Sequence, residues 1–427
     1  MAHSIPSLED CGISPTRGFI FPEVPLTAFT DPYYTPWDEI ITKLPTSVAS
    51  QTLRQEVQDL PTLDISKLSS ELEFRRAYVV LGFLVHAYVW RSSADGKPTE
   101  CVPPQLAEPF LAVCERLGSE PVLTYAGICL WNWAAKDGAI DEHSGTDAFG
   151  VEKLKLLASF TGTPGESAFY LIPVVIEARG GHLVSSFLDA IGAAERGDAD
   201  SVTDALVGAA ETLTRLNQHL RGFYSALEPD VFFHQLRPYL SGAKGMEEKG
   251  LPRGMVFQKV DGTEVTAKCV GASAAQSSLF QFLDTVLGVE HSGDTAGEFK
   301  VRATFDELTH EKTATKVNQI LRGYMPIQHR KFLEQVSTLP NIRAFVLDNP
   351  ENERLKGAFN DCLKELRSWR GQHVAVVSRY AVQPARALMA ASQQGDKGGK
   401  PPANARSGIL PFLQDAKKNS LGIGEAE

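Results

Sequence analysis

The sequence lacks the patterns by which several common classes of protein can be identified. Its six cysteines are scattered without any C-x-x-C pair, which excludes a zinc-finger pattern and provides no disulfide framework. It also has no His-Glu-x-x-His motif, no glycine-rich phosphate loop and no G-x-S-x-G elbow. Zinc protease, nucleotide-binding and α/β-hydrolase functions therefore find no support in the sequence.

Positive charge and long apolar runs are scarce as well. The net charge is -10 and no stripe of Lys and Arg is visible, which argues against a nucleic-acid partner or an anionic membrane surface. The longest apolar run, Tyr78 to Trp90, is about 13 residues and contains His86, so it is too short to span a bilayer. The N-terminus has neither a positive start nor an apolar run, and we expect a cytoplasmic protein with no membrane partner.

What the sequence contains is an ordinary globular composition with helical periodicity along most of its length. Apolar residues at three-and-four spacing predict an all-α, mainly helical fold. One stretch, Leu251 to Cys269, alternates instead and contains Asp261-Gly262, which predicts a single short β-hairpin. Residues 1 to about 75 are first rich in proline and aromatics and then polar, which predicts an irregular arm lying over the body.

A polar, glycine-bearing stretch at residues 136–151 is the best candidate for a boundary between two domains. It divides the chain into a small N-terminal domain, residues 1–150, and a large helical domain, residues 151–427. Within the second domain, GDKGGKPPANARSG at residues 395–408 is a low-complexity tract, which predicts a mobile loop.

The helix predicted over Gly357 to Val382 carries the most informative histidine. Its apolar residues form one buried stripe, and His373 lies on that stripe with Arg370 one turn earlier. An imidazole there costs free energy unless its nitrogens find partners, so His373 is either a hydrogen-bonded core histidine or a metal ligand. An iron-binding histidine with a guanidinium one turn away would suit a haem and its propionates.

Four segments, in order, resemble the indoleamine 2,3-dioxygenase family of haem enzymes, which open the indole ring of tryptophan. They are LRPYLSGAKG (236–245), GASAAQSSLFQFLD (271–284), RGYMPIQHRKFL (322–333) and LRSWRGQHVAVVSRY (366–380). The similarity extends more thinly through PVLTYAGICLWNW and AFYLIPVVIE toward about residue 80. The resemblance implies a mainly helical fold in which the small domain caps the large one, with the haem between them.

The same resemblance implies how the haem is held. His373 matches the iron ligand, Arg370 matches an arginine beside a propionate, and Asp284 matches the acid that steadies this arginine. Ala272 and Ser273 match residues near the haem edge. The cofactor is expected to be haem b (iron protoporphyrin IX), one per chain, bound non-covalently because no C-x-x-C-H motif is present.

The resemblance also implies a substrate pocket on the other face of the haem. Its predicted residues are Tyr125, Ile128, Phe169, Pro173, Phe232, Arg237, Ser273 and Ala274. Arg237 matches the arginine that holds the substrate carboxylate, and Phe169 and Phe232 match aromatics that pack on the indole and the oxygen. On spacing alone the aromatic and aliphatic residues of this set are ordinary core residues, and Arg237 is a surface salt-bridge partner.

Two features of this pocket require comment. Phe232 and Arg237 are five residues apart and would not share a face of an ideal α-helix, so we expect a break before Pro238 to turn the guanidinium inward. Tyr125 and Ile128 are one turn apart on a helix predicted over Val122 to Ala135, which the resemblance places in the roof of the pocket.

The chain departs from the family pattern at three places. Pro173 stands where a small serine is common, Ala272 where a glycine is usual, and Ala403-Asn404-Ala405-Arg406 where the family has a glycine-threonine-glycine-glycine run. Proline removes a hydroxyl and stiffens the helix. These departures bear on the substrate.

The predicted pocket residues include no histidine or carboxylate that could act as a general acid or base. Direct insertion of O2 across the indole C2–C3 bond of tryptophan, giving N-formylkynurenine, is the function that the resemblance implies, with an external electron donor to reduce the iron and a monomeric enzyme. Two alternatives stay open: an oxygenase of the same fold acting on another indole or amine, and a haem-binding protein without turnover.

Overall fold

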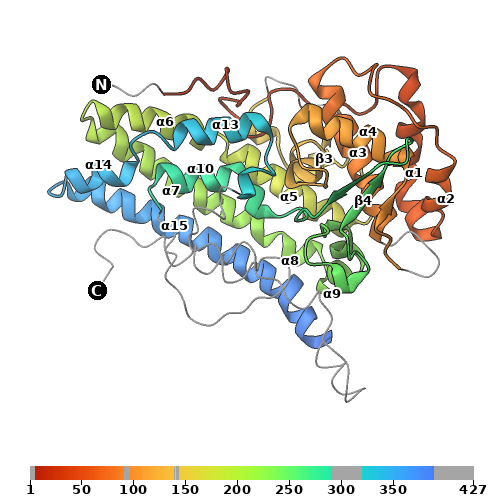
Figure 1. Ribbon diagram of the computed structural model, residues 1–427. Coiled ribbons are helices and arrows are strands. Elements are labelled where there is room, and N and C mark those ends of the chain that lie inside the picture. The colour runs from red at the N-terminus through yellow and green to blue at the C-terminus, as the bar shows by residue number, and fades with distance from the viewer. Residues whose placement is uncertain (1–4, 91–96, 139, 141–143, 290–319, 389–427) are drawn as a thin grey trace.

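A computed structural model describes residues 5–90, 97–138, 140, 144–289 and 320–388. The low-complexity tract at 395–408, with its predicted mobile loop, lies outside these residues. The described residues are mainly helical, which confirms the predicted fold class. Helices α1 to α4 gather at one end of an elongated body, and α6, α7, α14 and α15 extend to the other (Figure 1).

The N-terminal part is more helical than expected. After the short turn η1 (Pro32–Tyr34) come α1 (Thr35–Ser50), α2 (Leu53–Gln58), α3 (Glu71–Trp90) and α4 (Pro104–Leu117). The prediction of an irregular arm to residue 75 is therefore wrong for 35–58. Asp31 caps the entry by accepting the Tyr33 N–H, and Trp37, Ile41 and Leu44 form a buried face at helical spacing.

Irregular arm structure is found at residues 5–31, part of which packs against helices of the second half of the chain, and again at residues 59–70. Phe21 stacks on His329, with ring centroids 4.8 Å apart, and the Arg75 guanidinium covers Phe21 at 3.7 Å. The arm crosses the α5–α6 junction at Gly18, where a Cβ would lie 2.7 Å from the Cα of Gly181. A side chain cannot fit there, so this crossing requires glycine.

The predicted hairpin is present as β4 (Met255–Gln258) and β5 (Glu264–Ala267). Strand β4 pairs in parallel with β1 (Cys101–Val102), so the hairpin of the second half of the chain joins a strand of the first half. A second pair, β2 (Ala134–Ala135) with β3 (Leu154–Lys155), was not predicted because two residues are too short to show alternation.

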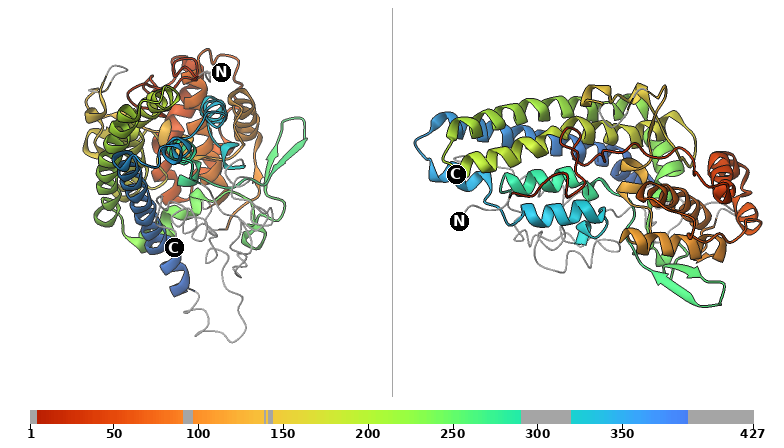
Figure 2. Two further views of the ribbon diagram at one scale, coloured as in Figure 1. Left: turned by 90° about the vertical axis from the view of Figure 1, so that its left-hand side faces the viewer. Right: turned by 90° about the horizontal axis from the view of Figure 1, so that it is seen from above.

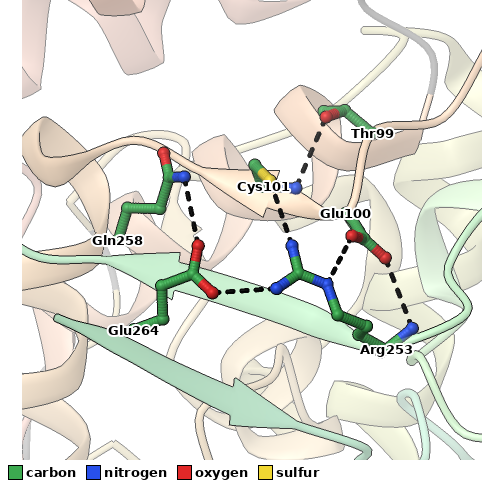
Figure 3. A network of polar contacts seen from close by, with 6 residues as sticks. All are labelled: Thr99, Glu100, Cys101, Arg253, Gln258 and Glu264. Carbon is green, nitrogen blue, oxygen red and sulfur yellow. Dashed lines mark hydrogen bonds and ion pairs between the residues drawn. The ribbon is translucent and has the colours of Figure 1, made fainter. Parts of the chain in front are cut away.

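Arg253 ties the hairpin to β1 from the surface side (Figure 3). Its Nε donates to Glu100 Oε1 at 2.7 Å, and its Nη1 donates to Glu264 Oε2 at 2.8 Å. Arg253 is about half exposed, so these ion pairs orient the two strands more than they stabilise them. The division near residue 150 stays a prediction, since this sheet crosses it.

The second half of the chain is a helical body. Its helices are α5 (Pro164–Gly180), α6 (His182–Glu195), α7 (Ala199–Arg221), α8 (Phe223–Ala226), α9 (Pro229–Val231), α10 (Ser278–Val286), α13 (Ile327–Val336), α14 (Ile342–Asp348) and α15 (Glu353–Val377). The short 3-10 turns η3 (Thr146–Ala148) and η4 (Val151–Lys153) precede α5, and η6 (Arg237–Leu240), η7 (Glu247–Lys249) and η8 (Ala274–Gln276) lie between α9 and α10. Helices α7 and α15 lie side by side along the body (Figure 2).

Helix α15 begins four residues before the helix predicted over Gly357 to Val382 and ends at Val377, and the last five predicted residues form a π-helical segment. Asn352 caps its N-terminus by accepting the Leu355 N–H, and Phe359, Leu363 and Leu366 bury one face. The 32-residue stretch Pro164–Glu195 is long and apolar enough to cross a membrane, but 72% of its apolar window is buried. Packing in the protein core accounts for this composition.

Candidate functional site

A cavity of about 300 Å³ lies between the roof around Tyr125 and Ile128, helix α5 and helix α15. Its size and mostly apolar wall are those of a small-molecule site. Every predicted site residue lines it except Arg370 and Asp284. The predicted residues in its wall are Tyr125, Ile128, Phe169, Pro173, Phe232, Arg237, Ala272, Ser273, Ala274 and His373. The structure thus brings them together, while their individual roles stay predictions.

Three π-helical segments in the described part of the chain all contribute to this wall. They are η2 (Ala126–Leu130), η5 (Phe232–Leu236) and η9 (Ser378–Val382). Each π turn contains one residue more than an α-helical turn. Its side chains therefore point in other directions than they would in a regular α-helix. The helix predicted over 122–135 is present only at residues 125–130 and is wrong on either side of them. Beyond Leu130, Asn132 instead donates to the Ala158 carbonyl at 2.9 Å and accepts its N–H at 2.7 Å.

Segment η5 explains how Phe232 and Arg237 reach the same cavity. The Arg237 N–H bonds to the Phe232 carbonyl, an i→i+5 bond that stacks residues five apart on one face. The expected break before Pro238 is thus a π turn followed by a 3-10 turn. Burial lowers the pKa of Arg237 to about 10, so it remains a cation at neutral pH.

An aromatic slot stands beside Arg237. Phe169 and Phe232 are in contact, with ring centroids 4.8 Å apart, and Tyr380 meets Phe232 edge-on at 6.0 Å. The Tyr380 hydroxyl lies 2.8 Å from the Phe223 carbonyl and 2.9 Å from the Leu227 carbonyl, which holds η9 against α8. Sequence reasoning missed Tyr380, although it lies seven residues after His373, two helical turns along the same face.

His373 lies in the α15 part of the wall. Its ring borders the cavity and is half-buried, and burial lowers its pKa to about 4, so the imidazole is neutral at physiological pH. Its Nδ1 is buried and has no hydrogen-bond partner, which does not fit a satisfied core histidine. A neutral imidazole facing a cavity fits a ligand of haem iron.

Aromatic rings support His373 from the side. Phe280 stacks on Trp369 with centroids 3.9 Å apart and planes within 8°, and its centroid lies 6.0 Å from that of His373. All three line the cavity. The flat stack limits the positions that the imidazole can take.

Arg370 and Asp284 form a buried ion pair behind the wall. Arg370 is 2% exposed, and burial lowers its pKa to about 9. The pair joins α15 to α10, three residues from His373 in the chain. It therefore places a positive group next to the predicted iron ligand, and contact with a propionate stays a prediction.

Two loops close the cavity edge by packing backbone against backbone. A Cβ on Gly271 would lie 1.9 Å from the Leu240 carbonyl oxygen, and one on Gly242 would lie 2.2 Å from the Cys269 oxygen. Lys244, which sequence reasoning missed, reaches the cavity from the loop that contains Gly242. Ala272, Ser273 and Ala274 follow Gly271 and keep this edge narrow.

The expectation that the cavity has no carboxylate is wrong. Glu177 lines it, four residues after Pro173 and eight after Phe169, so all three share a face of α5. Burial raises the pKa of Glu177 to about 7. Helical spacing from Phe169 could have found this residue. Helix α5 continues through Pro173, which leaves the Phe169 carbonyl without its usual helical N–H partner.

Comparison with known proteins gives a consistent result. A sequence model of the indoleamine 2,3-dioxygenase family matches residues 7–424. An indoleamine 2,3-dioxygenase of Saccharomyces cerevisiae is 34% identical over 388 residues, covering 89% of this chain and 81% of the relative. A 6-hydroxytryptophan 2,3-dioxygenase of Fusarium equiseti is 35% identical over 393 residues, covering 92% and 89%. Indoleamine 2,3-dioxygenase 1 of Rattus norvegicus is 32% identical over 412 residues, covering 96% and 94%.

Proposed function

Because this chain belongs to the indoleamine 2,3-dioxygenase family of haem-dependent dioxygenases, we propose that it inserts both atoms of O2 across the indole C2–C3 bond of tryptophan, giving N-formylkynurenine. The supporting observation is one cavity with an unpaired imidazole in one wall and, in the rest of the wall, an aromatic slot with a buried guanidinium.

The cofactor proposed for this cavity is a single, non-covalent haem b. His373 would hold its iron, and Arg370, steadied by Asp284, would neutralise a propionate. When bound there, the haem supplies O2 binding and activation, for which amino-acid side chains have no equivalent. An external donor must supply the electron that makes the iron ferrous.

The residues of the chain bind and orient the substrate. Phe169 and Phe232 form an apolar slot for a flat indole, and Arg237 offers a fork of donors to the amino-acid carboxylate. Two such anchors at opposite ends of tryptophan fix the ring relative to the wall that carries His373. Fixing the ring in this way removes much of the entropic part of the barrier.

The cellular setting is proposed from composition. With a net charge of -10 and no basic stripe, the protein is proposed to act as a cytoplasmic monomer on small molecules, without nucleic acid or membrane as partner.

The proposal is tested with purified protein, haem, a reductant and tryptophan. We expect a Soret band, and product absorbing as formylkynurenine; unchanged tryptophan would refute the proposal. His373→Ala should abolish the Soret band. His219→Ala is the matched control, because His219 is also half-buried but lies on α7 outside the cavity wall, and it should leave the band unchanged.

A second candidate is the same oxygen insertion on another indole. The relative from Fusarium equiseti is named for 6-hydroxytryptophan, and Pro173, which departs from the small serine common in the family, lines this cavity. Rates with tryptophan and 6-hydroxytryptophan, compared as kcat/KM, separate the two. A preference of more than about tenfold, or about 1.4 kcal/mol, for the hydroxylated ring would replace the first proposal with the second.

A further inference from the structure

Glu177 is a buried carboxyl group in the cavity wall with very uneven hydrogen bonding. Its Oε1 accepts from the Ser277 hydroxyl at 2.5 Å and from the Tyr125 hydroxyl at 3.0 Å. Its Oε2 is buried and has no partner. The side chain is only 2% exposed. One oxygen therefore has two donors, and the other has none.

A second buried glutamate on the same helix shows the contrast. Glu166, near the start of α5, accepts the N–H groups of Phe160, Thr161 and Gly162 and the Thr161 hydroxyl, and these bonds use both of its oxygens. It holds the loop before α5 against the first turn of that helix, and it lies outside the cavity wall. Glu177, in contrast, uses only one of its two oxygens, so its burial needs another explanation.

The hydrogen-bond pattern indicates where a proton resides. An ionised carboxylate with one oxygen buried and unpaired carries a large desolvation cost, whereas a neutral acid costs much less. Because Oε1 already accepts two hydroxyl donors, the proton belongs on Oε2. Burial, which raises the pKa of Glu177 to about 7, agrees with this arrangement.

The three partners come from three different parts of the fold. Tyr125 begins the roof segment η2, Glu177 is on α5, and Ser277 caps α10, the helix that also carries Phe280 and Asp284. The Tyr125 N–H also donates to Gln276 Oε1 at 2.8 Å. A single carboxyl group thus joins the roof to the helix that supports the His373 side.

The other ionisable groups around the cavity do not titrate in the same range. Tyr125 and Cys129, on η2, have pKa values raised well above their usual range by burial, so both are neutral. Arg237 stays cationic, and the pKa of His373, on α15, is lowered to about 4. Lys244 adds a further amine to the wall.

We propose that Glu177 is a positioning residue of this cavity: it holds a proton on Oε2, ties Tyr125 and Ser277 to α5 through Oε1, and admits a carboxylate-bearing ligand only while it is neutral. When the proton leaves for solvent, a negative charge appears in a low-dielectric wall and repels the ligand carboxylate. The ligand identity rests on the proposed function, whereas the protonation state does not.

The protonation state is tested first, without substrate, by infrared difference spectra of the haem-loaded protein between pH 5 and pH 9. We expect a carbonyl band of a neutral carboxylic acid that disappears as pH rises through about 7 in the wild type. Glu177→Gln should lack this band. Glu211→Gln, which alters an exposed glutamate on α7, should retain it. The proposal would be overturned if the wild-type spectrum lacked the band. It would also be overturned if the band were unchanged in the spectrum of Glu177→Gln.

Two variants keep the test decisive if Glu177→Gln folds poorly. Ser277→Ala and Tyr125→Phe each remove one hydroxyl that stabilises the charged form, so each should move the midpoint to higher pH. If the midpoint of the infrared titration is unchanged in both variants, the proposed role of the two hydroxyl hydrogen bonds is refuted.

Ligand binding is tested next, with tryptophan and with indole, which has no carboxylate. If only the neutral form binds, the Kd for tryptophan should rise roughly tenfold per pH unit above about 7. Indole should show no such rise, and Glu177→Gln should make the tryptophan curve flat. A tryptophan curve that is equally steep in Glu177→Gln would contradict the proposal. Lack of turnover with a normal infrared titration would count against the proposed function alone.

Discussion

The two sides of the cavity are built in opposite ways. The side of His373 is one regular α-helix, α15, in which helical spacing sets His373, Trp369 and Arg370 in place. The rest of the wall uses π segments, one of which, η9, continues α15, and also α5, with a proline in mid-helix. Charge differs as well, since the first side balances its cation in a buried ion pair, while the second holds a neutral acid and a cation. The regular helix therefore carries His373, the predicted ligand of one fixed group. The irregular segments line the part of the cavity that is predicted to fit a substrate.

The largest effect should come from the ion pair on the α15 side. Asp284→Ala leaves the Arg370 guanidinium buried without its carboxylate, which should lower the free energy of unfolding by about 3–5 kcal/mol. Urea unfolding with and without added haem measures this loss. The double variant Arg370→Met with Asp284→Leu should recover much of it, and Asp348→Ala, at an exposed site, should cost almost nothing. A loss below 1 kcal/mol for Asp284→Ala would show that the pair is not effectively buried.

The acid of the other side should make stability depend on pH. The pKa of Glu177 is raised from 4.5 to about 7 in the folded protein, so the folded state holds this proton over a range in which the unfolded state loses it. Its contribution is full below about pH 4.5 and is lost as pH rises through 7, a total of about 3 kcal/mol. Comparing urea unfolding of the wild type and Glu177→Gln at pH 5 and pH 8 tests this, and parallel losses in both proteins would contradict it.

Arg237 should matter for one class of ligand only. Arg237→Lys keeps the charge but loses the planar fork, so tryptophan should bind about tenfold more weakly, or about 1.4 kcal/mol. Arg237→Ala should cost more, about 2–3 kcal/mol. Indole, which lacks a carboxylate, serves as the control ligand in a titration of each variant, and an equal loss for indole would assign Arg237 to packing.

The smallest effect should come from the hydroxyl of Tyr380. Tyr380→Phe removes a donor shared by the Phe223 and Leu227 carbonyls and leaves them unpaired, which should cost about 1–2 kcal/mol in urea unfolding. Tyr224→Phe is the control, because Tyr224 is a half-buried neighbour whose ring lies 6.3 Å from that of Tyr380. Similar costs for both variants would mean that the two carbonyl bonds are not what holds η9.

The comparison of the two sides also explains which site residues could be predicted. His373 and Arg370 were found because their helix follows 3.6-residue periodicity. The other side was reached only by family resemblance, since a π turn disrupts that period at Arg237. Glu177 was missed although it obeys helical spacing with Phe169, because a carboxylate on a helix is ordinarily taken as solvent-exposed. The helices at 35–58 were missed because prolines and aromatics resembled an arm.

By itself the sequence determined the helical fold class, the Asp261-Gly262 hairpin and the apolar stripe that carries His373, since all three depend on the spacing of neighbouring residues. Only the tertiary structure decided that the hairpin joins β1, that Arg237 faces the aromatic slot, and that Glu177 is buried with one unpaired oxygen. The physical reason is that burial and hydrogen bonding depend on residues distant in the chain. Such partners alter the pKa and orientation of a side chain without leaving a periodic trace in the sequence.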